Sequence, residues 1–162
     1  MDSFDDVMRE FYDGEVAGEA IYSVLLGSVS KRDERLKIGT LLQLETETKA
    51  WLRAPMVARS LSIVESANVR KDSIEIMQPI LAWPWEKKVQ AIFDALSKRF
   101  VPRYTGHLAA ARSRGDTDEI AICLHMLEHE QAQLEFSRRE LSGASADSLE
   151  PVIKHLKYPL SR

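Results

Sequence analysis

Residues 4–25 read FDDVMREFYDGEVAGEAIYSVL, and their apolar and small residues recur at helical spacing. Residues three and four positions apart share one face of an α-helix, so the pattern predicts an amphipathic helix. Its buried stripe consists of Phe4, Met8, Phe11, Gly18, Tyr22 and Leu25. Glu15 interrupts this stripe on the buried side, where a carboxylate is costly unless it is paired, protonated or bound to a metal.

Three further segments show the same periodicity. One runs from a capping-box pattern at Ser30–Asp33 to about Ser60, one from Trp83 to Gly115, and one from Asp116 to Gly143. No segment alternates apolar and polar residues as a half-buried strand does. The sequence therefore predicts an all-α fold, with four main helices in a bundle over residues 1–143. Residues 144–162 are predicted to form a C-terminal tail that docks on the bundle.

The connection between the second and third main helices is long. Residues 62–83 are irregular, and Pro79 interrupts their apolar residues, so we interpret them as a link with one short helix. Antiparallel neighbours need only ~2–8 residues between them, whereas this link has about 20. Its length predicts a crossover that joins two parallel helices of a four-helix bundle.

Composition narrows the class of protein. The hydrophobic content is 44% and the net charge is −3, which argues against nucleic-acid binding through a basic face. The single cysteine, Cys123, cannot form an intrachain disulfide, and no apolar run reaches the ~18–20 residues of a membrane span. We expect a cytoplasmic protein that binds neither nucleic acid nor membrane.

Carboxylates occupy the middle of three predicted helices. Glu45 interrupts the second stripe as Glu15 interrupts the first, and Glu128 lies beside the inward face of the fourth. Glu15 and Glu45 are nearly equidistant along the chain from the turn near residue 29, so they should lie at similar depth. Three acids at one level are what a carboxylate-bridged metal pair needs, and iron and manganese accept oxygen ligands.

These patterns resemble those of the ferritin-like superfamily. Its di-iron members take a Glu from two helices and Glu-x-x-His from the other two. Glu15 with Tyr22 is similar to the first-helix pattern, and residues 45–48 (ETET) and 128–131 (EHEQ) stand in the place of the two Glu-x-x-His motifs. The resemblance covers about residues 4–142. It implies a ferritin-like four-helix bundle with an iron- or manganese-dependent oxidoreductase centre that uses O₂.

The chain departs from the pattern at two helices. Thr48 and Gln131 stand where histidines would be expected, and the third helix carries Pro102 and Arg103 at the level of its missing carboxylate. We therefore predict an atypical or incomplete centre. The candidate metal ligands are Glu15, Glu45 and Glu128, with His107 or His125.

Other interpretations stay open. Arg103 could neutralise the carboxylates in a buried ion network, and His107 could be a core histidine. His125 and His129 share a helix face that could lie at the surface, and Glu19 and Glu47 could be solvated or interfacial. A metal-free bundle could serve as an interaction scaffold or carry a small apolar ligand, and the helices could instead belong to a haem-oxygenase-like lineage. Three tryptophans, which are enriched at interfaces, suggest a homodimer: Trp51, Trp83 and Trp85.

Overall fold

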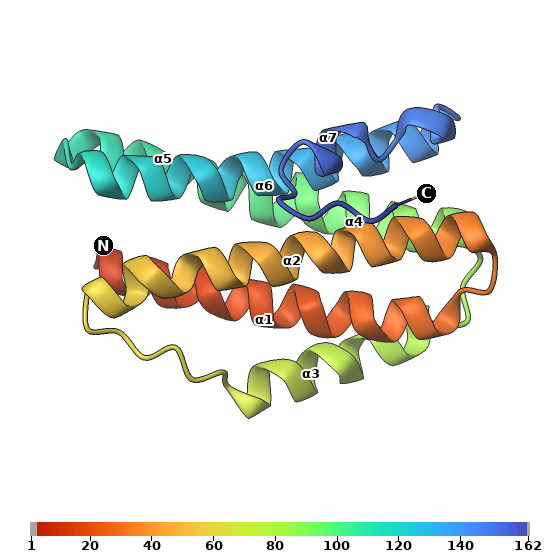
Figure 1. Cartoon of the computed structure of the whole chain (residues 1–162), viewed down its shortest axis with the longest axis horizontal. Helices are drawn as coiled ribbons and strands as arrows, with labels where there is room; N and C mark the ends of the chain where they lie inside the picture. The colour runs from red at the N-terminus through yellow and green to blue at the C-terminus, as the bar shows by residue number, and fades with distance from the viewer. Residues whose placement is uncertain (1–2, 162) are drawn as a thin grey trace. The chain divides into compact units, whose positions relative to one another are not determined.

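The computed structural model describes residues 3–161, and every element within that range is helical. The main α-helices are α1 (Phe4–Ser28), α2 (Arg32–Ala58), α3 (Ala67–Met77), α4 (Trp85–Ala95), α5 (Val101–Arg114) and α6 (Thr117–Leu141) (Figure 1). Shorter elements are the 3₁₀ turns η1 (Gln78–Ile80) and η3 (Ser145–Asp147), the π-turn η2 (Leu96–Phe100), and α7 (Glu150–Ile153). The all-α prediction is confirmed.

The chain divides into two compact units. Unit 1 takes in the residues up to Trp83 and those from Leu156 onward, and unit 2 is Pro84–His155. Each unit is built on a pair of long helices, α1 with α2 in unit 1, and the continuous α4–η2–α5 segment with α6 in unit 2. The four-helix bundle and its ferritin-like topology stay predictions. Between residues 3 and 161, no helix is both long and apolar enough to cross a membrane.

Unit 1 begins with a capped helix. The Ser3 side chain accepts a hydrogen bond from the Asp6 amide, and the Asp6 carboxylate accepts one from the Ser3 amide. The stripe predicted for α1 is buried at Phe4, Met8, Phe11, Tyr22 and Leu25. The capping box predicted at Ser30 is wrong, because α2 begins one residue later, with Lys31 at its N-cap and no side-chain hydrogen bond there.

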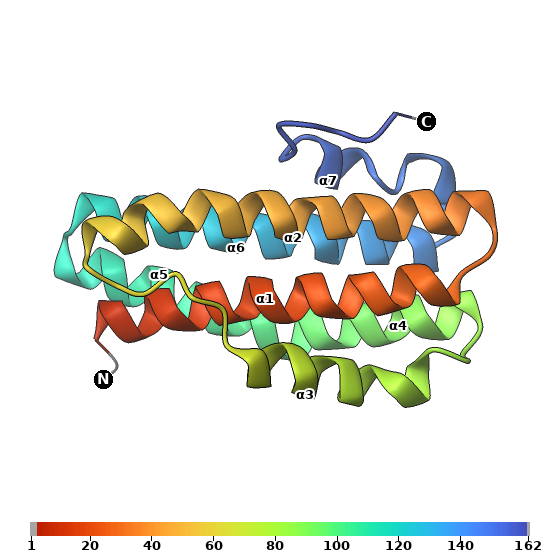
Figure 2. The ribbon, with the colours of Figure 1, turned by 60° about the horizontal axis from the view of Figure 1, so that its bottom comes forward.

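The long link contains the expected short helix. It is α3, which runs alongside α1 in both views (Figures 1 and 2). The Tyr12 hydroxyl donates a hydrogen bond to the carbonyl of Ile63 at 2.9 Å, which ties the start of the link to α1. The link therefore packs on unit 1 and is not a loose loop.

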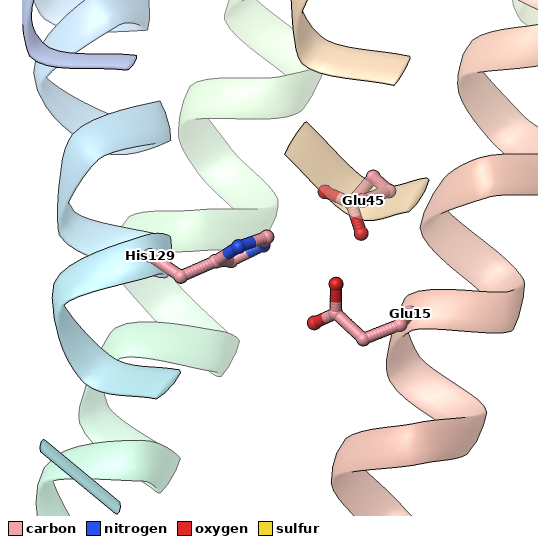
Figure 3. Close-up of side chains that lie close together, drawn as sticks. All are labelled: Glu15, Glu45 and His129. Carbon is pink, nitrogen blue, oxygen red and sulfur yellow. The ribbon is translucent and has the colours of Figure 1, made fainter. Parts of the chain in front are cut away.

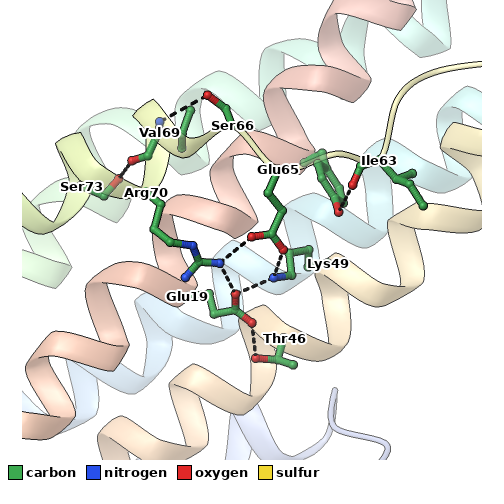
Figure 4. Close-up of polar contacts among 10 residues, drawn as sticks. Glu19, Thr46, Lys49, Ile63, Glu65, Ser66, Val69, Arg70 and Ser73 are labelled. Carbon is green, nitrogen blue, oxygen red and sulfur yellow. Dashed lines mark hydrogen bonds and ion pairs between the residues drawn. The ribbon is translucent and has the colours of Figure 1, made fainter.

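Ion pairs between charged side chains connect α1, α2, the link and α3 (Figure 4). The Lys49 ammonium contacts Glu19 and lies 2.6 Å from Glu65, and its side chain is only 6% exposed. Arg70 donates to the same two carboxylates, at 2.8 and 2.7 Å, respectively. The Thr46 hydroxyl donates to Glu19 at 2.9 Å. We call these five residues the ion cluster. Of the two predicted alternatives for Glu19, solvated or interfacial, these contacts agree with the interfacial one.

The C-terminal residues make contacts both in unit 2 and in unit 1. In unit 2, α7 packs on α6, and Arg139 donates to Glu150 at 3.0 Å. In unit 1, the Glu47 carboxylate accepts hydrogen bonds from the amides of Lys157 and Tyr158 at 2.6 and 2.9 Å, respectively. Glu47 therefore holds the C-terminal segment, which agrees with the interfacial alternative predicted for it.

In unit 2, the third predicted helix runs on through Pro102. Proline has no amide hydrogen and interrupts the hydrogen-bond ladder, and the wider π-turn η2 directly precedes it. Gly115 ends α5 with a φ of 75°, a conformation that favours glycine. The Asp116 carboxylate then accepts hydrogen bonds from the amides of Asp118 and Glu119 at the start of α6. Both boundaries agree with the sequence prediction.

The tryptophans differ in their surroundings. Trp85 donates a hydrogen bond from its indole nitrogen to Glu140 at 3.0 Å, so helix packing within unit 2 accounts for it. Trp51 and Trp83 are each 41% exposed. The homodimer stays a prediction.

Replacing Lys49 with methionine tests the ion cluster. The methionine keeps most of the apolar stem and removes the ammonium, which leaves two partly buried carboxylates less well neutralised. We expect the free energy of unfolding to fall by about 2 kcal/mol, measured by urea denaturation. Lys71→Met is the control, because Lys71 is 70% exposed and lies 3.8 Å from Glu75, so its change should stay below about 0.5 kcal/mol. Equal losses in the two variants would contradict a specific role for the cluster.

The same cluster predicts a pH dependence. Burial raises the pKa of Glu19, but hydrogen bonds from Lys49, Arg70 and Thr46 outweigh it and bring the pKa from 4.5 to about 2. Because the folded-state pKa is the lower one, this stabilisation is present above pH 4.5 and is lost as the pH falls toward 2. Urea denaturation across this range should show a smaller loss of stability for Lys49→Met than for the wild type.

Candidate metal centre

Two buried carboxylates face each other inside unit 1. Glu15 on α1 is 1% exposed and Glu45 on α2 is 4% exposed. A carboxylate oxygen of one lies within 4.8 Å of a carboxylate oxygen of the other. Figure 3 shows the two side chains pointing toward each other from their helices. They lie at one level, as their distances along the chain from the intervening turn predict.

The Glu45 carboxylate occupies space that a side chain at Gly18 would need. A Cβ built at Gly18 would lie 2.1 Å from Glu45 Oε2 and 2.5 Å from Cδ. The carboxylate therefore sits against the backbone of α1, one helical turn after Glu15. The absence of a side chain at Gly18 leaves the space in which the Glu45 carboxylate lies.

The ion cluster lies next to this pair along both helices. Glu19 follows Gly18 on α1, Thr46 follows Glu45 on α2, and their 2.9 Å hydrogen bond joins the helices at that level. Lys49, one turn farther along α2, contacts Glu19 as well. These contacts fix the register of α1 against α2 where Glu15 and Glu45 meet.

Two ionised carboxylates this close repel each other in a buried setting, and a cation or a proton between them relieves the repulsion. A divalent cation does so while gaining oxygen ligands, which suit iron and manganese. The donor set of this pair therefore fits the metals that the sequence indicates. The fit rests on carboxylate chemistry and on the distance between the two side chains.

One of the predicted ligands in unit 2, Glu128, is not where the sequence prediction placed it. Glu128 is exposed on α6, so its predicted place beside the buried face is wrong. The next residue, His129 (labelled in Figure 3), is 1% exposed. Its Nε2 lies 2.8 Å from the Gln133 amide nitrogen. Gln131, in the position of the expected histidine, is also exposed.

The face of α6 that carries Glu128 is exposed, and Leu124, one turn before it, is also 38% exposed. The buried face instead carries Cys123, Met126, His129, Ala132, Gln133 and Phe136. These residues also recur at intervals of three and four, and that periodicity would have placed His129 inside.

The other predicted ligands of unit 2 are partly buried. His107 on α5 lies with its ring centroid 6.1 Å from that of Tyr104, a packing contact that agrees with its interpretation as a core histidine. Arg103 is exposed on α5. The ion network predicted around Arg103 stays a prediction.

Burial and neighbouring histidines of unit 2 lower the pKa values of His125 and His155. Burial, together with the nearby His129 and His155, lowers the pKa of His125 from 6.5 to about 4. Burial and His129 also lower the pKa of His155, while Glu128 acts in the opposite sense. At neutral pH the His125 imidazole is therefore uncharged, which is the form that binds a metal.

An NMR titration tests the environment of His125. Because its folded-state pKa is lower than the ordinary 6.5, its ring protons should titrate with a midpoint near 4. The resonance is assigned by its loss in His125→Gln. A midpoint near 6.5 in the folded protein would contradict the burial of this imidazole. The neutral form stabilises the fold above pH 6.5, and that contribution is lost as the pH falls toward 4.

Comparisons with known proteins place the chain in no family: no protein-family model, curated protein or solved structure matches it.

Proposed function

We propose that this chain is a metal-binding protein whose centre contains Glu15 and Glu45 and takes iron or manganese. The observation that carries the proposal is the meeting of these two buried carboxylates, from two helices, with oxygens within 4.8 Å. Buried carboxylates are retained at this cost mainly where they are paired with a cation or have a functional role.

The resemblance to ferritin-like di-iron proteins supports the choice of metal. Glu15 and Glu45 are the positions at which it implies a ligand on the first and second helices. Thr48, which is buried where the resemblance expects a histidine, makes the centre atypical. Bound iron or manganese would supply redox chemistry toward O₂, so the finer proposal is an oxidoreductase.

The residues of unit 1 have distinct parts in this proposal. Glu15 and Glu45 bind the cation, and the low exposure of both side chains keeps bulk water away from it. Thr46 and Lys49 hold Glu19 and thereby keep α1 and α2 in register beside the ligands. Other side chains or water complete the coordination.

The first test is metal content. The purified protein is incubated with Fe(II) without oxygen, or with Mn(II), dialysed, and its metal per chain determined by elemental analysis. We expect stoichiometric metal in the wild type and a loss in Glu15→Ala and Glu45→Ala, because each removes a ligand. Glu128→Ala is the matched control, and it should keep its metal because Glu128 is exposed.

A further measurement refines the result. Oxygen uptake by the Fe(II)-loaded wild type, absent in Glu45→Ala, would support the oxidoreductase. Wild-type protein with no more metal than a Glu15→Ala/Glu45→Ala double variant would remove the metal centre and favour the metal-free scaffold.

A further inference from the structure

We infer that Gly18 is a positioning residue of the metal centre, which holds the Glu45 carboxylate in its binding orientation by leaving the space that a Cβ would fill. The inference rests on the proposed metal-binding function and names a residue that sets the geometry of that site.

The space beside Gly18 is filled by one group. The three atoms nearest to a Cβ built there are Oε2, Cδ and Cγ of Glu45, at 2.1, 2.5 and 3.1 Å, respectively. All three belong to the end of the Glu45 side chain. An alanine at position 18 therefore competes with the carboxylate itself.

Backbone conformation does not account for a glycine at this position. Among the described residues, the glycines with positive φ are Gly115 and Gly143, and Gly18 lies inside α1. Glycine is also a poor residue for a helix interior, where alanine is the best. Room for the Glu45 carboxylate is the physical reason that the structure offers.

Gly27 provides a matched control within the same helix. A Cβ built at Gly27 meets no heavy atom within 4 Å. Gly27→Ala therefore makes the same chemical change on α1 without entering an occupied space. Any general effect of an added methyl group on α1 should appear in both variants.

The clash in Gly18→Ala is most easily relieved at Glu45. The side chain of Glu45 rotates about several single bonds, whereas a backbone shift of α1 against α2 would also disturb the hydrogen bond from the Thr46 side chain to Glu19. We therefore expect the variant to fold with the Glu45 carboxylate displaced from Glu15. Its effect should be larger on metal binding than on the fold.

The experiment measures Mn(II) affinity by isothermal titration and helicity by circular dichroism. Gly18→Ala should remain helical and lose at least about tenfold in affinity, the scale typical of removing support from a ligand. Gly27→Ala should bind as the wild type does. If the wild type binds no Mn(II) or Fe(II), the proposed function fails; if Gly18→Ala binds as tightly as Gly27→Ala, only the role of Gly18 fails.

A shorter ligand separates positioning from general packing. Glu45→Asp withdraws the carboxylate by one methylene, so an added Cβ at position 18 should cost less affinity in this background than with Glu45. An equal loss in both backgrounds would mark a packing defect and overturn the inference. An unfolded Gly18→Ala that Glu45→Asp does not restore would overturn it as well.

Discussion

The space left on α1 by the missing side chain of Gly18 is the constraint on which the candidate centre depends. Because residue 18 has no side chain, the Glu45 carboxylate can lie against the backbone of α1, within reach of Glu15. A larger residue would separate the two acids or push Glu45 elsewhere. The site therefore depends on the missing side chain at position 18 of α1 as well as on the two carboxylates.

Unit 1 handles buried charge in two different ways along the same pair of helices. The ion cluster balances the carboxylates of Glu19 and Glu65 with the basic groups of Lys49 and Arg70. One turn away along α1, Glu15 meets Glu45, an acid facing an acid. The first arrangement ties four segments together. The second brings two carboxyl groups together and suits a centre that takes up a cation, which is why the two neighbouring groups have different proposed roles.

The sequence predicted what depends on local pattern. The long helices, the Gly115–Asp116 boundary and the shared depth of Glu15 and Glu45 follow from periodicity and chain distance alone. The ion cluster could not be foreseen, because Lys49 is buried only through partners contributed by α1, the link and α3. On α6, the residues that share a face with Glu128 and those that share a face with His129 both recur at intervals of three and four. The Glu-x-x-His spacing indicated Glu128, one residue before the buried His129.

The residues of α2 from Glu45 to Lys49 make contacts with several different segments of unit 1. Successive residues of an α-helix point about 100° apart, so neighbours in sequence face different surroundings. Glu45 turns toward Glu15, Thr46 bonds to Glu19, and Glu47 accepts the amides of the C-terminal segment. Lys49 then joins Thr46 in holding Glu19. A shift of α2 by one residue would exchange these partners at once, so the contacts that secure the fold of unit 1 also keep Glu45 turned toward Glu15.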